Sequence, residues 1–148
     1  MSCGLWLRRA SSRGLPYLTT TISRFGQGRR PLAGLNAVGT LPWSGPAHVL
    51  TAWNPSSIVR PESSNRAANK ELDALLRQRG LAPEWVIGRS DDRTWSEESL
   101  LIQGLGTEEA VELGRRFGQL AVFELEADEL RVVRTSDGEV VGRTARRR

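Results

Sequence analysis

Residues 51–72 read TAWNPSSIVRPESSNRAANKEL and join an apolar strand to a helix through a polar loop. Asn54 follows the strand, and Asn65 and Asn69 stand one turn apart near the start of the helix. Asparagine is a poor helix residue because its side chain competes for backbone hydrogen bonds. Both helical asparagines lie on the extension of the apolar stripe formed by Ala68, Leu72, Leu75 and Leu76. They are therefore predicted to face inward, where leucine or alanine is usual.

On either side of this stretch, strand and helix patterns alternate in a regular order along the chain. The predicted strands are 47–53, 84–88, 95–103 and 119–126, the helices begin at Ser63 or Ser64 and at Thr107, and the closing hairpin comprises 129–135 and 139–142. A β-α-β-β-α-β order is typical of the split βαβ, ferredoxin-like fold. The sequence thus predicts an α+β domain with a C-terminal β-hairpin, an antiparallel sheet and both helices on one face.

Composition divides the 148 residues into three parts. Residues 1–45 are rich in Arg, Ser and Gly and lack acidic residues and periodicity, so we expect a disordered basic leader. An organellar transit peptide would fit it. A start site assigned too early in a GC-rich bacterial gene fits better, because the chain has 20 Arg and one Lys. Residues 46–143 are expected to form a single domain, and residues 144–148 a basic tail.

The charge of the chain is distributed unevenly. All 17 acidic residues lie from Glu62 onward, whereas seven of the 21 basic residues precede it. The remaining 14 basic residues against 17 acidic ones give residues 62–148 a net charge of −3. The RNA-binding version of the predicted fold presents aromatic residues on its central strands, but strand 95–103 offers Glu97 and Glu98. A nucleic-acid partner is therefore not expected.

The rare residue types exclude several kinds of site. The chain has one cysteine, Cys3, and one histidine, His48, so neither a disulfide framework nor a Cys/His metal site is predicted. His48 lies in an apolar run and is interpreted as an ordinary strand residue rather than the base of a hydrolytic triad. No run of about 18 apolar residues predicts a membrane span. We expect a cytoplasmic protein without a cofactor.

The predicted topology brings four points of the chain to one rim of the sheet. These points are the end of the first strand, the start of the first helix, and the starts of the third and fourth strands. The polar residues of the sequence gather at the same four points. The candidate ligand-binding residues are Asn54, Asn65, Arg66, Asn69, Trp95, Ser99 and Gln119. A network that only satisfies the backbone of the loop after Asn54 would use the same residues, and this alternative stays open.

Glu97 and Glu98 are the candidate catalytic residues. Adjacent residues of a strand point to opposite faces of the sheet, so one of the two carboxylates must face the helices. Leu100 and Ile102 are the better candidates for the helix-facing side, which places Glu98 on that side. Either carboxylate could act as a general acid or base.

Four strings in the chain, LTAWNP, NRAANKEL, WSEESLLIQG and RRFGQLAVFE, occur in order between residues 47 and 125. They resemble the pattern of an uncharacterised bacterial family, domain of unknown function 3293. The resemblance implies as family-typical positions Asn54, Asn65, Arg66, Asn69, Trp95, Glu97, Glu98, Ser99 and Gln119. It implies no activity.

Two functions are compatible with the predicted rim. The first is a small binding or regulatory module whose rim pocket recognises a small polar molecule or a peptide end. The second is an enzyme that uses Glu97 or Glu98 as general acid or base. No nucleophile or phosphate-binding loop accompanies these carboxylates in the sequence, so the binding module is favoured. No oligomeric state is predicted.

Overall fold

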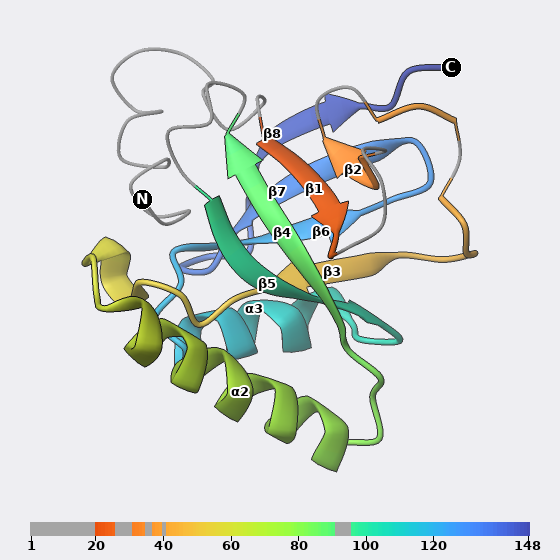
Figure 1. Ribbon diagram of the computed structural model, residues 1–148. Coiled ribbons are helices and arrows are strands. Elements are labelled where there is room, and N and C mark those ends of the chain that lie inside the picture. The colour runs from red at the N-terminus through yellow and green to blue at the C-terminus, as the bar shows by residue number, and fades with distance from the viewer. Residues whose placement is uncertain (1–19, 26–30, 35–36, 40, 91–95) are drawn as a thin grey trace.

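The computed structural model describes residues 20–25, 31–34, 37–39, 41–90 and 96–148, which form a curved sheet with two α-helices outside it (Figure 1). The strands are β1 (Thr20–Arg24), β2 (Ala33–Gly34), β3 (Ala47–Leu50), β4 (Glu84–Ser90), β5 (Ser96–Gln103), β6 (Ala121–Leu125), β7 (Glu129–Arg134) and β8 (Val140–Ala145). The helices are α2 (Glu62–Gln78) and α3 (Thr107–Arg116), and one 3-10 turn, η2 (Pro55–Ser57), precedes α2.

The eight strands follow the order β2-β1-β4-β5-β3-β6-β7-β8, and neighbouring strands are antiparallel. The sheet curls until it is nearly closed into a barrel (Figure 1). Near the closure, the Gly39 N–H donates to the Arg147 carbonyl over 2.8 Å, and the Arg147 N–H donates to the Ala37 carbonyl over 2.9 Å. The Arg146 guanidinium adds hydrogen bonds to carbonyls of the same N-terminal segment. The C-terminal residues thus fasten the segment that follows β2.

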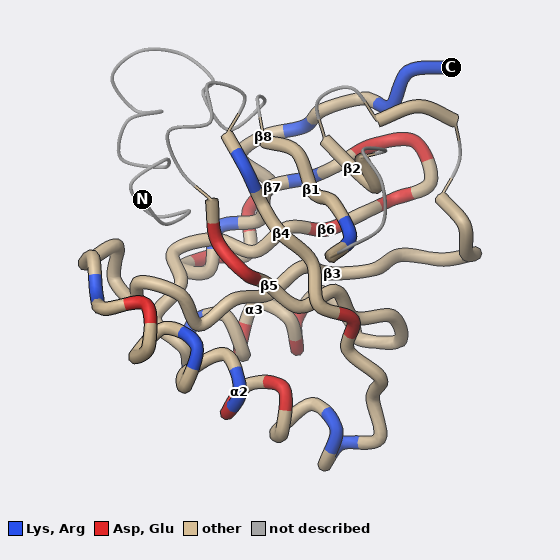
Figure 2. The backbone as a smooth tube through the Cα atoms, in the orientation of Figure 1, with Lys and Arg blue, Asp and Glu red and all other residues tan. Residues whose placement is uncertain are grey.

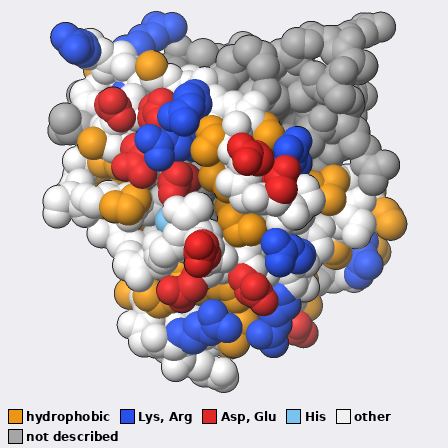
Figure 3. All heavy atoms as spheres, turned by 180° about the vertical axis from the view of Figure 1, so that it is seen from behind, with side chains coloured by type: hydrophobic (Ala, Val, Ile, Leu, Met, Phe, Trp, Pro, Cys, Tyr) orange, Lys and Arg blue, Asp and Glu red, His pale blue; other side chains and the backbone are white. Residues whose placement is uncertain are grey.

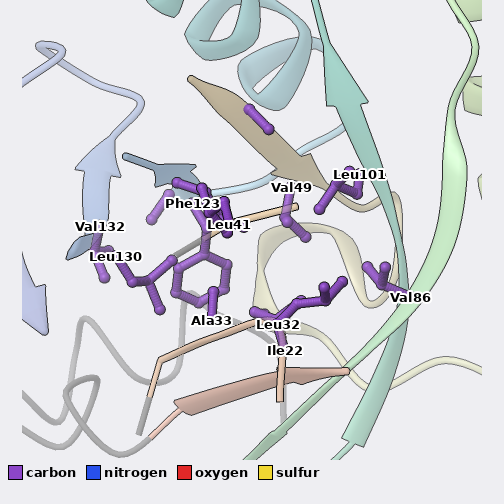
Figure 4. Packing of buried hydrophobic residues seen from close by; sticks show 13 residues of the cluster. Ile22, Leu32, Ala33, Leu41, Val49, Val86, Leu101, Phe123, Leu130 and Val132 are labelled. Atoms are coloured by element: carbon purple, nitrogen blue, oxygen red, sulfur yellow. The ribbon is translucent and has the colours of Figure 1, made fainter. Parts of the chain in front are cut away.

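Apolar side chains are buried on both faces of the sheet. The inner cluster fills the curl (Figure 4) and comprises Ile22, Leu32, Ala33, Leu41, Ala47, Val49, Val86, Leu101, Ala121, Phe123, Leu125, Leu130 and Val132. The outer cluster lies between the sheet and the helices and comprises Leu50, Ala52, Leu72, Leu76, Leu100, Ile102, Leu105, Ala110, Val111, Leu113, Val122 and Val133. Consecutive residues of one strand, such as Leu100 and Leu101, therefore belong to different clusters.

The predicted ferredoxin-like fold is wrong, because the sheet has eight strands and is nearly closed rather than open on one side. The elements from 47 to 145 exist close to their predicted bounds, and both helices do pack on one face. The sequence did contain a signal for the closure. AHVL in β3 and AVFEL in β6 are buried along their whole length, and such runs are typical of strands covered on both faces. Ala121, Phe123 and Leu125 accordingly face the curl and not the helices.

Part of the expected leader is ordered. β1 pairs with β4, β2 pairs with β1, and Ile22 of β1 is fully buried in the inner cluster. At the other end, β8 continues into the predicted tail and ends at Ala145. Residues 1–19 lie outside the described residues, so the disorder expected there stays a prediction. Within the described part of the chain, neither helix combines the length and the apolar character that crossing a membrane requires.

The contact between α3 and β6 provides a test of this packing. A Cβ atom added to Gly114 would lie 2.5 Å from Val122 Cγ1 and 3.1 Å from Thr135 Cγ2. Alanine favours a helix by up to about 1 kcal/mol over glycine, but overpacking typically costs about 1–3 kcal/mol. We expect Gly114→Ala to lower the free energy of unfolding, measured in urea, by about 1 kcal/mol.

A double-mutant cycle provides the control for this substitution. Val122→Ala removes the methyl group that the new Cβ would strike, so the double variant should lose less stability than the two single losses combined. Strict additivity would contradict the steric explanation.

Candidate functional site

The loop Asn54–Pro61 connects β3 to α2 and has an unusual backbone. Asn54, Ser56 and Ser57 have φ angles of 44°, 56° and 62°, in the left-handed region. Asparagine tolerates this conformation, but at each serine it costs about 1–3 kcal/mol and persists only because the surrounding structure enforces it. We call residues 54–61 the pinned loop, because buried side chains on both sides of it hold its backbone.

The first of these side chains is Asn65 on α2. Its Oδ1 accepts from the Asn54 N–H over 2.8 Å, and its Nδ2 donates to Asn54 Oδ1 over 2.8 Å and to the Arg60 carbonyl over 3.3 Å. Asn54 Oδ1 also accepts from the Arg60 N–H over 3.0 Å. The two carboxamides thereby join both ends of the pinned loop to the first turn of α2.

Asn69, one turn further along α2, ties the helix to two strands. Its Oδ1 accepts from the Ala52 N–H over 2.7 Å, and its Nδ2 donates to the Glu98 carbonyl over 2.8 Å. The Thr51 hydroxyl donates to the same carbonyl over 2.8 Å. Asn69 has no exposed surface, so its hydrogen bonds replace water completely.

The turn before β6 supports the loop from its other side. Gln119 Nε2 donates to the Trp53 carbonyl over 3.0 Å, and the Ser56 N–H donates to the Gly118 carbonyl over 2.8 Å. Gly118 has a φ of 73°, and a Cβ atom there would lie 2.7 Å from Pro55 Cβ. Glycine is therefore required both for the turn and for the close approach of the loop.

The structure brings together most of the residues that the sequence singled out. Asn54, Asn65, Asn69 and Gln119 do converge on one rim, and each of the four is buried. Their hydrogen bonds go to one another and to the backbone of residues 52–60 and of β5, so the convergence stabilises the fold. It is the carbonyl of Glu98 that meets Asn69, not its carboxylate.

The remaining candidates lie apart from this network. Arg66 is at the solvent edge, where its guanidinium lies 2.6 Å from a Glu62 carboxylate oxygen and 3.4 Å from Glu98 Oε1. Arg66 is exposed, and charged residues occur along the whole of α2 (Figure 2). Glu97 and Ser99 are buried and alternate with Glu98, which places them on the inner face of β5. Trp95 lies outside the described residues.

A second polar group, which includes the histidine interpreted from the sequence as an ordinary strand residue, crosses the outer face of the sheet. His48, Glu124, Arg131 and Arg143 are successive register partners on β3, β6, β7 and β8. His48 Nε2 lies 3.2 Å from Glu124 Oε1, and the Thr107 hydroxyl at the start of α3 donates to the same oxygen. From behind, acidic and basic side chains gather over one side of the sheet (Figure 3). The sequence did indicate this group, because His48 and Glu124 are polar residues within otherwise apolar strand runs.

Burial shapes the protonation of this pair. It lowers the pKa of His48 below the ordinary value of about 6.5, although the Glu124 carboxylate acts in the opposite direction. Burial alone would raise the pKa of Glu124, but hydrogen bonds from Thr107, His48 and Arg131 outweigh it and hold that pKa low. A neutral imidazole thus lies beside an ionised carboxylate. Both groups are buried, so they are placed to hold α3 on the sheet rather than to meet a substrate.

Two further features bear on the chemistry of the surface. Ile58 and Val59 in the pinned loop are 60% and 76% exposed, the second being the most exposed large apolar side chain of the described residues. The described ranges contain no cluster of three or more His, Cys, Asp or Glu side chains that could hold a metal ion. Exposed apolar side chains on a fixed loop are typical of a surface that binds another molecule.

The chain is therefore a nearly closed antiparallel barrel with two helices and a rigid rim loop. Residues 50–122, almost half of the chain, match the family described as Protein of unknown function (DUF3293). The resemblance noted in the sequence is thereby confirmed. No curated protein and no solved structure matches the chain.

The network around Asn69 makes a measurable prediction. Asn69→Ala leaves the Ala52 N–H buried without its partner, which costs about 1–3 kcal/mol, and it leaves the Glu98 carbonyl with the Thr51 hydroxyl but without the Asn69 amide. We expect the free energy of unfolding in urea to fall by about 2–4 kcal/mol. Lys70→Ala, on the outward side of the same helix, is the matched control and should change it by less than about 0.5 kcal/mol. Equal effects of the two substitutions would mean that the Asn69 carboxamide is dispensable to the fold.

The buried imidazole predicts how stability depends on pH. Unfolded His48 takes up a proton near pH 6.5, whereas the folded form, with its lowered pKa, resists protonation. The free energy of unfolding should therefore be highest above about pH 6.5 and fall as the pH drops below it. His48→Gln removes the only histidine of the chain and should flatten this dependence between about pH 7 and pH 5 in urea titrations. If the free energy of unfolding of His48→Gln depends on pH as strongly as that of the parent, the dependence comes from carboxylates and not from His48.

Proposed function

We propose that this domain is a binding module, and that its recognition element is the outer surface of the pinned loop. The observation that carries the proposal is the pairing of a strained backbone with exposed Ile58 and Val59. The partner that suits two aliphatic side chains is a protein or peptide with an apolar surface.

The buried asparagines support the proposal. Asn65 and Asn69 occupy inward positions of α2 where apolar residues would add to the outer cluster. Asn65 holds the pinned loop in a conformation that its serines disfavour, and Asn69 fixes the helix that carries Asn65. A loop fixed in this way loses little conformational entropy on binding, which strengthens its complexes. A fixed conformation of the pinned loop therefore suits a protein that presents one loop shape to a binding partner.

The alternatives have weaker support. A pocket for a small polar ligand would need free carboxamides, but those of Asn54, Asn65 and Asn69 are engaged by the chain itself. An enzyme would need a carboxylate that reaches a substrate. Glu97 is only 2% exposed, and the Glu98 carboxylate lies beside the Arg66 guanidinium. Glu97 therefore lacks the access that general acid or base catalysis requires, and the Glu98 carboxylate is engaged by an ion pair.

Site-specific photo-crosslinking tests the proposal. A photoreactive amino acid replaces Val59 in the full chain, in cells that normally contain the protein. We expect a discrete crosslinked product that contains a second protein, identified by mass spectrometry.

The same amino acid at Val38 provides the matched control. Val38 is also β-branched and 62% exposed, but it lies in the segment that pairs with the C-terminal residues. The same products from both positions, or none from position 59, would contradict a binding role of the loop.

A further inference from the structure

We infer that the pinned loop enters a groove of its partner as an extended segment, with Ile58 and Val59 held between opposite walls. This inference rests on the proposed function and specifies its partner. The partner is a protein with an apolar groove that accepts an extended chain and has an acidic residue beside it.

The backbone of the segment from Ile58 to Pro61 is extended. Ile58 has φ −90° and ψ 121°, and Pro61 has φ −52° and ψ 141°. Between them, Val59 and Arg60 have negative φ angles, and the proline after Arg60 disfavours the helical region there. The segment thus has the shape of a short strand that stands at the surface without a neighbouring strand.

The side chains show that this strand is open on both faces. Adjacent residues of an extended chain point to opposite sides. A segment lying on the protein would bury one of Ile58 and Val59 and expose the other. Here both are exposed, by 60% and 76%. A flat partner could cover only one of them, whereas a groove covers both.

The hydrogen bonds of the segment fit the same geometry. The backbone N–H and carbonyl of Arg60 are bound by Asn54 and Asn65. The backbone groups of Val59 make no hydrogen bond with the residues that the structure describes. Val59 can therefore pair with a strand of the partner while Arg60 anchors the loop to its own domain. Peptide recognition by addition of a strand uses this division between backbone pairing and alternate side-chain pockets.

Charge specifies the partner further. Arg60 is exposed and forms no ion pair within the described part of the chain, whereas Arg66 nearby on α2 is paired with Glu62 and Glu98. An acidic residue next to the groove would give Arg60 its counter-charge. Such complementarity mainly sets specificity and the rate of association.

The test places the photoreactive amino acid at Ile58 and at Val59 in separate full-length proteins. We expect both to crosslink to the same protein, at different peptides of that protein that lie on facing sides of its groove. Crosslinking from position 59 only would overturn the groove but leave the proposed function intact, whereas crosslinking from position 58 only would overturn both. The absence of products from both would overturn the groove and the proposed function together. A product with twice the mass of the chain would mean a second copy and would overturn the partner inferred here.

Substitutions provide an independent measurement with the crosslinker at exposed Ser56. Ile58→Asp and Val59→Asp should each reduce the crosslinking yield about tenfold or more, because each loses a buried apolar contact and places a charge in the groove. Val38→Asp, the control, should leave the yield unchanged. Thermal unfolding would verify that the three variants are folded. A large effect of only one of the two loop substitutions would favour a flat surface and contradict the groove.

Discussion

The hydrogen bonds of one side chain, that of Asn69, fix the relation between α2 and the sheet. Its carboxamide binds an N–H just beyond β3 and a carbonyl of β5, so the helix cannot slide along either strand. With the helix fixed in this way, Asn65 lies within hydrogen-bonding distance of Asn54. These two hydrogen bonds hold the start of the pinned loop. In the buried interior these bonds have no competition from water, so their loss would be costly.

The barrel explains why such a small domain can support a strained loop. Its strands are covered on both faces, by the inner cluster and by the helices, so β3 and β5 form a rigid base on which the rim is built. The strain of Ser56 and Ser57 is local, and the packing that resists it is spread over the whole sheet. Gly118 completes the support, because its missing side chain lets the turn before β6 touch Pro55.

Much of the local structure could be predicted from the sequence, whereas the closure of the sheet was missed although the apolar runs of β3 and β6 were a signal for it. Helix caps, apolar stripes and turn glycines identify the elements from 47 to 145, and strand alternation places Glu98 toward the helices. β1 and β2 were missed because two strands of five and two residues in a basic, irregular segment carry no periodic signal. Asn54, Asn65, Asn69 and Gln119 do meet at one rim, although the ferredoxin-like topology from which this was expected is wrong. The sequence left open whether these side chains bind a ligand or satisfy the backbone, and their hydrogen bonds to backbone groups agree with the second alternative.

The position of β1 also affects how the molecule behaves outside its folded state. β1 covers the free edge of β4, a strand with Trp85, Val86 and Ile87 in succession. An uncovered strand of this kind offers its backbone to other chains and is a common starting point for aggregation. β1, the short strand from the arginine-rich segment, therefore protects the edge of β4 from pairing with other chains. A fragment beginning after it would keep both helices and the rim but would lose its protection against self-association through β4.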